Sequence, residues 1–473
     1  MLPSLTETAS RIRRRELSAR ELLEWQLRRI ELLDSRLHTF VSLQPEAALR
    51  EADRLDAAEL QGPLHGIPIS IKDNVEVEGV ATTAGSPLLD TAAARRDAEA
   101  VRRLRAAGAI VVGKNALYEL AFGAQSRHWP APENPWCRGR ATAGSSSGSA
   151  AAVSGGLSFA ALASDTGGSI RVPAAFCGVV GLRPTPGTIP REGLVRLSRL
   201  DELGPLARTA EDASTMFQVL SGRPRAAAPQ GSFRGLRFGT CTSGSDAPEV
   251  SVAVREFCDT ICELGAIAVG RLELDLAAAA AALWTIAGAD AAELWFERAR
   301  LGGSLVHPVV MERLVAGTKI GAEEIAHAQE SARRLTAELR RLFERIDLLV
   351  LAPAACSGYP LGARWLEHAG EPAEVSALVT RYTPLASVAG LPALVLPCGA
   401  DDGGMPLGVQ LVGAAGSDQM LLDVACEYQT VTSWHERVAT EAGDGGMAGL
   451  AEAVVADARP LARAPEPGTR HRV

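Results

Sequence analysis

Hydrophobic residues first recur at a regular spacing in the opening part of the chain. A capping-box pattern begins at Ser18, and apolar side chains follow at helical spacing up to Leu33. This spacing predicts an amphipathic helix that ends near Asp34. A second helix is predicted over residues 45–60, charged on one side and rich in alanine on the other. We therefore expect residues 1–60 to form an N-terminal helical arm.

The spacing changes to an alternation at residues 67–74, which read IPISIKDN. Alternate apolar positions predict a strand, and Lys72 stands at its end, where open α/β sheets place their sites. Residues 97–113 combine an amphipathic helix, a glycine and a buried strand, and this order predicts an αβ unit. Lys114 follows that strand. Nothing else marks it, so we interpret Lys114 as structural.

Composition limits the classes of protein to consider. With 473 residues and 47% hydrophobic residues, the chain can form two domains or one large α/β unit on a wide sheet. The net charge of −8 gives no basic footprint for nucleic acid. The eight cysteines form no CxxC pair and no apolar signal segment precedes the first arginine cluster, so we expect a cytoplasmic protein. The uncharged run at 276–289 is too short for a membrane span and predicts a buried helix.

Lysine is rare in this chain. Only three of the 48 basic residues are lysines: Lys72, Lys114 and Lys319. Arginine keeps its proton at accessible pH, whereas burial can lower the pKa of a lysine until it acts as a base. Lys72 is therefore a candidate base, although three lysines can also occur by chance.

Glycine and serine are concentrated between residues 142 and 187. Two turns of small residues, at 143–149 and 166–169, bracket uncharged segments rich in alanine. A flexible linker would lack such apolar partners. Small residues beside a core allow backbone N–H groups to approach a ligand, but two tight turns around a buried helix fit the same pattern.

Three motifs in this half of the chain resemble the amidase signature family. They are GIPISIKDN at 66–74, AGSSSGSAAAV at 143–153 and SDTGGSIRVPAAFCGVVGLRPTPG at 164–187. The resemblance is close over a signature core at 61–215 and weaker at 347–355 and 386–399. It implies a single large α/β domain over residues 61–438, with a mixed β-sheet flanked by helices.

The resemblance also implies a catalytic triad. Ser169 would be the nucleophile, Ser145 the bridging serine after a cis peptide bond from Gly144, and Lys72 the base. The chemistry fits, because a neutral lysine that acts through a second hydroxyl can activate a serine without a histidine.

By the same resemblance, backbone N–H groups of Thr166, Gly167 and Gly168, with that of Ser169, would form an oxyanion hole. Such donors lie at the start of a helix predicted over residues 170–177. Supporting roles fall to three further residues: Asp165, Arg171 and Ser146. We expect Asp165 and Arg171 to hold the turn by hydrogen bonds rather than to touch substrate.

The sequence departs from the family pattern at a few positions. Ala143 and Ser147 stand where glycine is usual, Ser164 also replaces a glycine, and Arg183 replaces a common lysine. The last change shows that the preference for arginine extends close to the site, while position 72 is still lysine.

A competing interpretation makes Ser146 the nucleophile, because residues 144–148 match the pattern G-x-S-x-G. That motif needs a strand before the serine, whereas residues 137–143 contain arginine and glycine. Its partner histidine would have to be one of His327, His368 and His435. No ligand spacing suggests a metal and no nucleotide fingerprint occurs, so we expect neither metal nor cofactor.

The second half of the chain is less informative. In the resembling family it shapes the acyl pocket, and four aromatic residues are candidates there, with packing in the core as the alternative for each. A loop at 118–140 with three more aromatic residues is a second candidate pocket wall, with a simple surface loop as the alternative. The composition of residues 439–473, rich in glycine, alanine, glutamate, arginine and proline, predicts a C-terminal tail that is partly disordered. The aromatic candidates are Trp284, Trp295, Trp365, Tyr382, Phe122, Trp129 and Trp136.

We therefore expect an amidase that hydrolyses a small carboxamide to carboxylate and ammonia, with no nucleic-acid or membrane partner; a homodimer is left open. The rival is the glutaminase subunit of a tRNA-dependent amidotransferase. That glutaminase typically has an acidic residue where this chain has Thr380, ahead of a motif that reads RYTPLA here at 381–386. This difference favours free hydrolysis. A non-catalytic relative is a third alternative.

Overall fold

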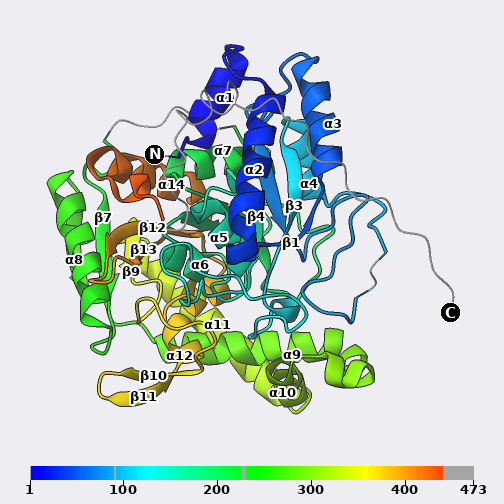
Figure 1. Cartoon of the computed structure of the whole chain (residues 1–473). Helices are drawn as coiled ribbons and strands as arrows, with labels where there is room; N and C mark the ends of the chain where they lie inside the picture. The colour runs from blue at the N-terminus through cyan, green and yellow to red at the C-terminus, as the bar shows by residue number, and fades with distance from the viewer. Residues whose placement is uncertain (1, 90–91, 225–230, 440–473) are drawn as a thin grey trace.

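The computed structural model describes residues 2–89, 92–224 and 231–439, which are built on one wide mixed β-sheet (Figure 1). In spatial order, its 11 strands are β1 (Phe40–Leu43), β3 (Ile110–Asn115), β2 (Pro68–Lys72), β4 (Ala160–Asp165), β6 (Glu202–Ala207), β5 (Val180–Arg183), β12 (Ala393–Ala400), β13 (Pro406–Val412), β9 (Leu348–Leu351), β7 (Arg237–Cys241) and β8 (Ile267–Arg271). Strands β3, β2 and β4 run parallel, as do β9, β7 and β8, and the other neighbours are antiparallel. The expected mixed sheet flanked by helices is confirmed.

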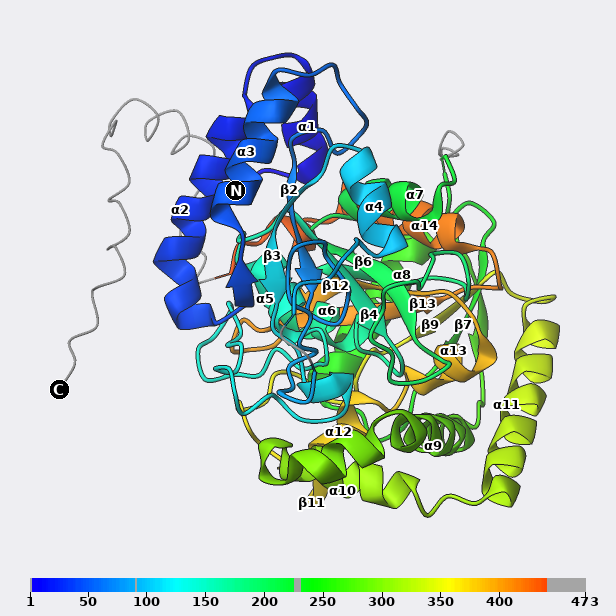
Figure 2. The same ribbon diagram turned by 90° about the vertical axis from the view of Figure 1, so that its right-hand side faces the viewer.

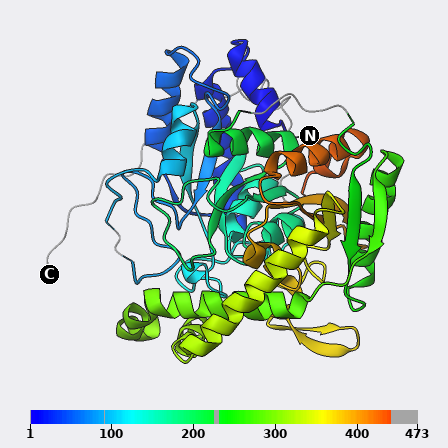
Figure 3. The ribbon, with the colours of Figure 1, turned by 180° about the vertical axis from the view of Figure 1, so that it is seen from behind.

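Helices cover both faces of the sheet (Figures 1 and 3). The first four helices come before or between the opening strands: α1 (Leu5–Arg13), α2 (Ala19–Leu37), α3 (Pro45–Asp56) and α4 (Glu99–Ala106). Those that pack on the central strands are α5 (Ser147–Ser154), α6 (Arg171–Cys177), α7 (Ala210–Ser221), α8 (Pro248–Glu263) and α14 (Asp418–Val431). Three short 3₁₀ turns are η1 (Glu119–Ala121), η2 (Gly303–Leu305) and η3 (Trp434–Glu436).

A helical layer borders one end of the sheet (Figure 2). It consists of α9 (Leu276–Gly302), α10 (Pro308–Gly317), α11 (Ala322–Leu342), α12 (Val375–Val379) and α13 (Pro384–Ala389). Helix α9 contacts α10, α11 and α13. A separate hairpin of β10 (Trp365–His368) and β11 (Glu371–Glu374) projects beside this layer.

Strand β4 shows how the core forms on both faces of the sheet. All six of its residues are buried, although a strand with one wet face would alternate. Leu162 belongs to the apolar cluster shared with α7 and α14, whereas Ala161 and Ala163 belong to the cluster shared with α5 and α6. The small alanines let α5 and α6 lie close to the sheet, which is where the candidate site forms.

The predicted helix behind Ser18 is α2. The Ser18 side chain accepts from the Glu21 N–H and the Glu21 carboxylate accepts from the Ser18 N–H, as a capping box requires. The helix continues past Asp34 to Leu37, because Leu37 is fully buried and His38 then turns the chain in a left-handed conformation.

The arm at 1–60 is not purely helical. Phe40–Leu43 form β1, which pairs antiparallel with β3 at one edge of the sheet. All four residues are half-buried, so no alternation marks the strand in the sequence. The second predicted helix ends at Asp56 rather than at residue 60.

Two further expectations concern the later part of the chain. The uncharged run at 276–289 is helical, but the helix extends to Gly302, and no helix of the described residues is long and apolar enough to cross a membrane. None of the eight cysteines, all of which lie in the described residues, forms a disulfide. The expected tail begins at Ala439, which is buried, while 440–473 lie outside the described residues.

Candidate active site

The three residues of the expected triad come from three separate segments that converge at the carboxyl ends of β2 and β4. Lys72 ends β2 and Ser145 precedes α5, while Ser169 lies in the turn between β4 and α6. Because β2 and β4 are parallel neighbours, their carboxyl ends lie on the same side of the sheet, beyond the last residues of the strands. The fold thus brings two strand ends and the serine-rich turn together.

Lys72 is fully buried, and its hydrogen-bond partners are neutral oxygens. Its Nζ donates to Ser145 Oγ at 2.8 Å, to Ser164 Oγ at 2.9 Å and to the Ser164 carbonyl oxygen at 3.2 Å. Burial lowers the pKa of Lys72 to about 7, although the charges of Asp165 and Asp201 oppose that shift. A large fraction of Lys72 is therefore neutral near neutral pH and able to accept a proton.

Contacts with Tyr118 fix the backbone at Ser145. The Gly144–Ser145 peptide bond is cis, as the resemblance implies. The Tyr118 N–H donates to the Ser145 carbonyl oxygen at 3.1 Å. A Cβ at Gly144 would lie 2.5 Å from the Tyr118 ring, so only glycine fits there. Ser145 Oγ consequently has a fixed position beside Lys72 Nζ.

Ser169 is half-buried and lines a cavity of about 410 Å³ together with Ser145. The Ser146 N–H donates to the Ser169 carbonyl oxygen at 3.2 Å, which ties the serine-rich turn to the turn after β4. Ser145, which is next to Lys72, and Ser169 thus line the same cavity.

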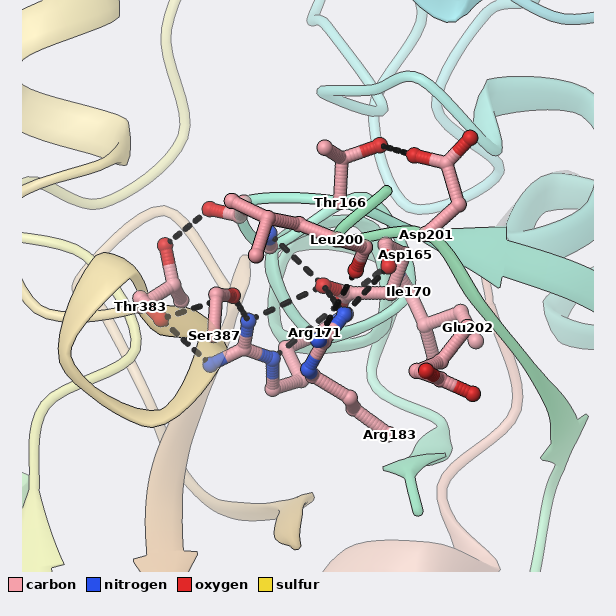
Figure 4. A network of polar contacts seen from close by, with 12 residues as sticks. Asp165, Thr166, Ile170, Arg171, Arg183, Leu200, Asp201, Glu202, Thr383 and Ser387 are labelled. Atoms are coloured by element: carbon pink, nitrogen blue, oxygen red, sulfur yellow. Dashed lines mark hydrogen bonds and ion pairs between the residues drawn. The ribbon is translucent and has the colours of Figure 1, made fainter. Parts of the chain in front are cut away.

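Asp165 organises the turn that carries Ser169 (Figure 4). Its carboxylate accepts from the Gly168 N–H at 2.9 Å and the Ile170 N–H at 3.0 Å. It also accepts from Arg171 Nη2 at 2.9 Å and Nε at 3.1 Å. Burial alone would raise the pKa of Asp165, but Arg171 and then Arg183 hold it well below its usual range. Asp165 is therefore a fixed anion.

Arg171 links this turn to the second half of the chain. Its Nη1 donates to the Thr383 carbonyl oxygen at 2.8 Å and to Gln410 Oε1 at 2.7 Å, and its Nη2 donates to Ser387 Oγ at 2.9 Å. The side chain is fully buried. Arg171 and Asp165 hold the turn, and neither lines the cavity.

The backbone at 166–168 differs in one respect from the expected oxyanion hole. The Gly168 N–H is directed to the Asp165 carboxylate and is not available to an oxyanion. Gly168 has a φ of +130°, and a Cβ there would lie 2.5 Å from Thr383 Oγ1, so its role is to allow the turn. Thr166 donates its hydroxyl to Asp201. An oxyanion-binding role for the N–H groups of Thr166, Gly167 and Ser169 stays a prediction.

Ser146 does not have the surroundings of a nucleophile. Its side chain is fully buried and donates to the Ser164 carbonyl oxygen at 3.2 Å. None of His327, His368 and His435 lines the cavity; His327 is exposed on α11, and His368 contacts the Ser245 carbonyl oxygen. The structure therefore does not assemble the competing triad.

Lys114 lies beside the site without entering it. It is fully buried and forms an ion pair with Asp73 at 2.8 Å, and it also donates to Thr82 Oγ1 at 3.1 Å. This pairing across the sheet end agrees with the structural role expected from the sequence.

The aromatic candidates separate into two groups. Phe122 and Trp284 line the cavity. The others do not: Trp295 packs in a helical core, Trp365 is 59% exposed on the hairpin, and buried Tyr382 donates to Asp246. Of the loop residues, Trp136 donates to the Cys177 carbonyl oxygen at 2.8 Å and Trp129 lies outside the cavity lining.

Several cavity and site residues were not predicted. Arg313 of α10 lies over the rings of Phe122 and Trp284 and lines the cavity, as does Glu374. Burial lowers the pKa of Arg313, and Glu374 opposes that shift. Ser164 contacts Lys72 directly. No local pattern in the sequence marks this contact, because it depends on the register of β4 beside β2.

The described residues contain no cluster of three or more histidine, cysteine or acidic side chains with the geometry to hold a metal ion.

Comparison with known proteins gives consistent results. Residues 21–422 match the sequence family described as Amidase. A relative in Synechococcus sp. (strain CC9311), which is a subunit of Glutamyl-tRNA(Gln) amidotransferase, is 34% identical over 474 residues, covering 90% of this chain and 96% of the relative.

Two solved structures are similar over nearly the whole chain. One belongs to "an unexpected vestigial protein complex" that "reveals the evolutionary origins of an s-triazine catabolic enzyme"; its TM-score is 0.85 at 30% identity, covering 91% of this chain and 98% of that one. The other is described as "Crystal structure of amidase", with a TM-score of 0.84 at 31% identity, covering 91% and 99%.

Proposed function

The chain belongs to the amidase family and acts on amide carbon–nitrogen bonds, and from that premise we propose that it hydrolyses a small carboxamide through an acyl-enzyme on Ser169. The observation that carries the proposal is the 2.8 Å contact between Lys72 Nζ and Ser145 Oγ. Lys72 is a buried base whose pKa is lowered by burial, and the Ser145 hydroxyl connects this base with the cavity.

In the first half-reaction, the Ser169 hydroxyl attacks the amide carbon while its proton passes to Ser145, whose own proton passes to neutral Lys72. The carbonyl oxygen becomes an oxyanion, and the backbone N–H groups of Thr166, Gly167 and Ser169 are the donors proposed to bind it. Collapse of this intermediate breaks the C–N bond. The proton held by Lys72 returns through Ser145 to the leaving nitrogen, which departs as ammonia.

The second half-reaction reverses these roles. A water molecule attacks the Ser169 ester and gives a proton to the same relay. The C–O bond to Ser169 then breaks and the relayed proton returns to the Ser169 oxygen, which frees the carboxylic acid. Lys72 is neutral again at the end of the cycle.

The first candidate substrate is glutamine. The relatives that belong to Glutamyl-tRNA(Gln) amidotransferase support it. So does the cavity, because Arg313 and Glu374 both line it and offer a cation for a carboxylate and an anion for an ammonium group. On this candidate the chain would supply ammonia within a tRNA-dependent amidotransferase.

The second candidate is a free amidase that acts on a less polar amide. Thr380 lines the cavity at the position where the amidotransferase glutaminase typically has an acidic residue. A further hollow of about 720 Å³, lined largely by apolar residues, shares Phe122, Trp284 and Arg313 with the catalytic cavity. Space of this kind suits an apolar group on the substrate.

Ammonia release from a panel of amides separates the two candidates. The purified chain is assayed with glutamine, aliphatic amides and aryl amides, alone and with the partner subunits and charged tRNA of an amidotransferase. Glutamine hydrolysis that appears only in the complex supports the first candidate, and hydrolysis of aliphatic or aryl amides by the chain alone supports the second. Absence of turnover on every amide in both settings would contradict the proposed function.

A further inference from the structure

Ser164 gives Lys72 two of its three hydrogen-bond acceptors. It lies next to the end of β4, is buried, and faces the Lys72 amine with both its hydroxyl, at 2.9 Å, and its carbonyl oxygen, at 3.2 Å. The third acceptor is Ser145 Oγ at 2.8 Å. A protonated lysine has three N–H donors, so within the described residues each donor has one acceptor.

We propose that Ser164 is a positioning residue that turns the lone pair of neutral Lys72 toward Ser145 and stabilises the ammonium group that forms when Lys72 accepts the proton. The neutral amine keeps two hydrogens. If the two Ser164 oxygens accept them, the lone pair is left facing Ser145 Oγ, which is the direction from which the proton arrives. This inference rests on the proposed function, in which Lys72 is the base.

Asn74 sets the direction of the Ser164 hydroxyl. Asn74 Nδ2 donates to Ser164 Oγ at 3.0 Å, and both side chains are buried. This bond uses one lone pair of Ser164 Oγ and leaves the other for Lys72. Because Asn74 lies two residues beyond Lys72, the base and the group that orients its acceptor come from the same end of β2.

Removing the hydroxyl leaves the charges around Lys72 in place. Asp165 and Asp201 face Lys72 and raise its pKa against the effect of burial. Arg171 and Arg183 neutralise Asp165 from α6 and β5, and on β3 the charge of Lys114 is paired with Asp73. None of these groups bonds to Ser164 Oγ. A change in titration on removing this oxygen therefore reports the hydrogen bond itself.

The test compares Ser164→Ala with Ser158→Ala, each measured as kcat and KM across pH on the best amide of the panel. Ser158 is a buried serine just before β4 that donates to the Ala160 carbonyl oxygen and has no contact with Lys72. Loss of the acceptor makes the ammonium less stable. In Ser164→Ala we expect the rising limb of the pH profile to move about one pH unit lower, because a hydrogen bond to a charged group is lost.

We also expect kcat of Ser164→Ala to fall about tenfold on the plateau, since the base is weaker and less well oriented, with KM nearly unchanged. Ser158→Ala should keep the parent limb and kcat. Ser164→Gly, which also removes the hydroxyl, should show the same shift and serves as the second variant if the alanine protein folds poorly.

Two outcomes would overturn the inference. One is a Ser164→Ala or Ser164→Gly enzyme with the parent limb and kcat; the other is a limb that moves to higher pH. If either outcome occurs while the parent shows a rising limb that Lys72 variants lack, the proposed function stands, and the role of Ser164 is limited to packing. If the parent shows no limb and Lys72 variants remain active, the proposed function fails first.

Discussion

Lys72 Nζ and Ser145 Oγ lie 2.8 Å apart in a fully buried contact, although 73 positions separate the two residues in the chain. Burial holds the pKa of the amine at about 7, and the hydroxyl lines the cavity that also contains Ser169. The pair therefore connects a base that is shielded from solvent with the space where a substrate binds.

Replacement of the two neighbouring serines distinguishes the proposed triad from its competitor. We expect Ser169→Ala to lower kcat by about 10⁴-fold or more and to abolish hydroxamate formation, because no acyl-enzyme forms. Ser146→Ala should keep substantial activity, since it removes only a hydrogen bond to the Ser164 carbonyl oxygen. Ammonia release measures both. The reverse pattern would move the nucleophile to Ser146.

Gly144 should tolerate no side chain. A Cβ there would lie 2.5 Å from the Tyr118 ring, so the turn must shift and displace Ser145. We expect Gly144→Ala to lose about a hundredfold in kcat/KM and about 1–3 kcal/mol in the free energy of unfolding. Gly244→Ala is the control, because nothing lies within 4 Å of its Cβ position. Parent-like activity in Gly144→Ala would show that the position of Ser145 is not critical.

Asp165→Asn tests the buried charges beneath the Ser169 turn. The substitution leaves Arg171 and Arg183 buried without their anion, for which we expect a loss of about 3–5 kcal/mol in the free energy of unfolding and a loss of activity. Denaturant unfolding measures the first. Glu16→Gln, at an exposed ion pair with Arg14, should change stability little. Equal stability of the two variants would contradict this role.

The positions of Lys72, Ser145 and Ser169 could be predicted because each lies in a short motif with its own local pattern. The mixed sheet could be predicted from the resemblance to the amidase signature family, whereas the residue pattern itself predicts only a strand at 67–74 and the αβ unit at 97–113. Strand β1 could not, because its residues are half-buried and gain their pairing only from β3. The hydrogen bond from the Gly168 N–H to the Asp165 carboxylate could not be predicted either, because it depends on the backbone conformation of the turn.

Contacts between distant segments set the limit of prediction. The approach of Ser164 to Lys72 follows from the register of β4 beside β2, which no local pattern contains. Arg313 reaches the cavity from α10 because that helix packs on α9. The presence of an aromatic residue in the sequence likewise does not tell whether it lines a cavity, packs in the core or lies on the surface. Trp284 lines the cavity, whereas Trp365 is exposed.

The pH profile of Lys72→Arg, beside the parent and Lys72→Ala, tests the central claim that Lys72 acts as a neutral base. In the parent, the active form is the deprotonated amine, so kcat/KM should rise with pH through about 7. Arginine keeps the charge but cannot accept the proton from Ser145. We therefore predict that a folded Lys72→Arg enzyme is nearly as inactive as Lys72→Ala and lacks the rising limb. Ordinary turnover by folded Lys72→Arg would contradict the account and remove Lys72 from the mechanism.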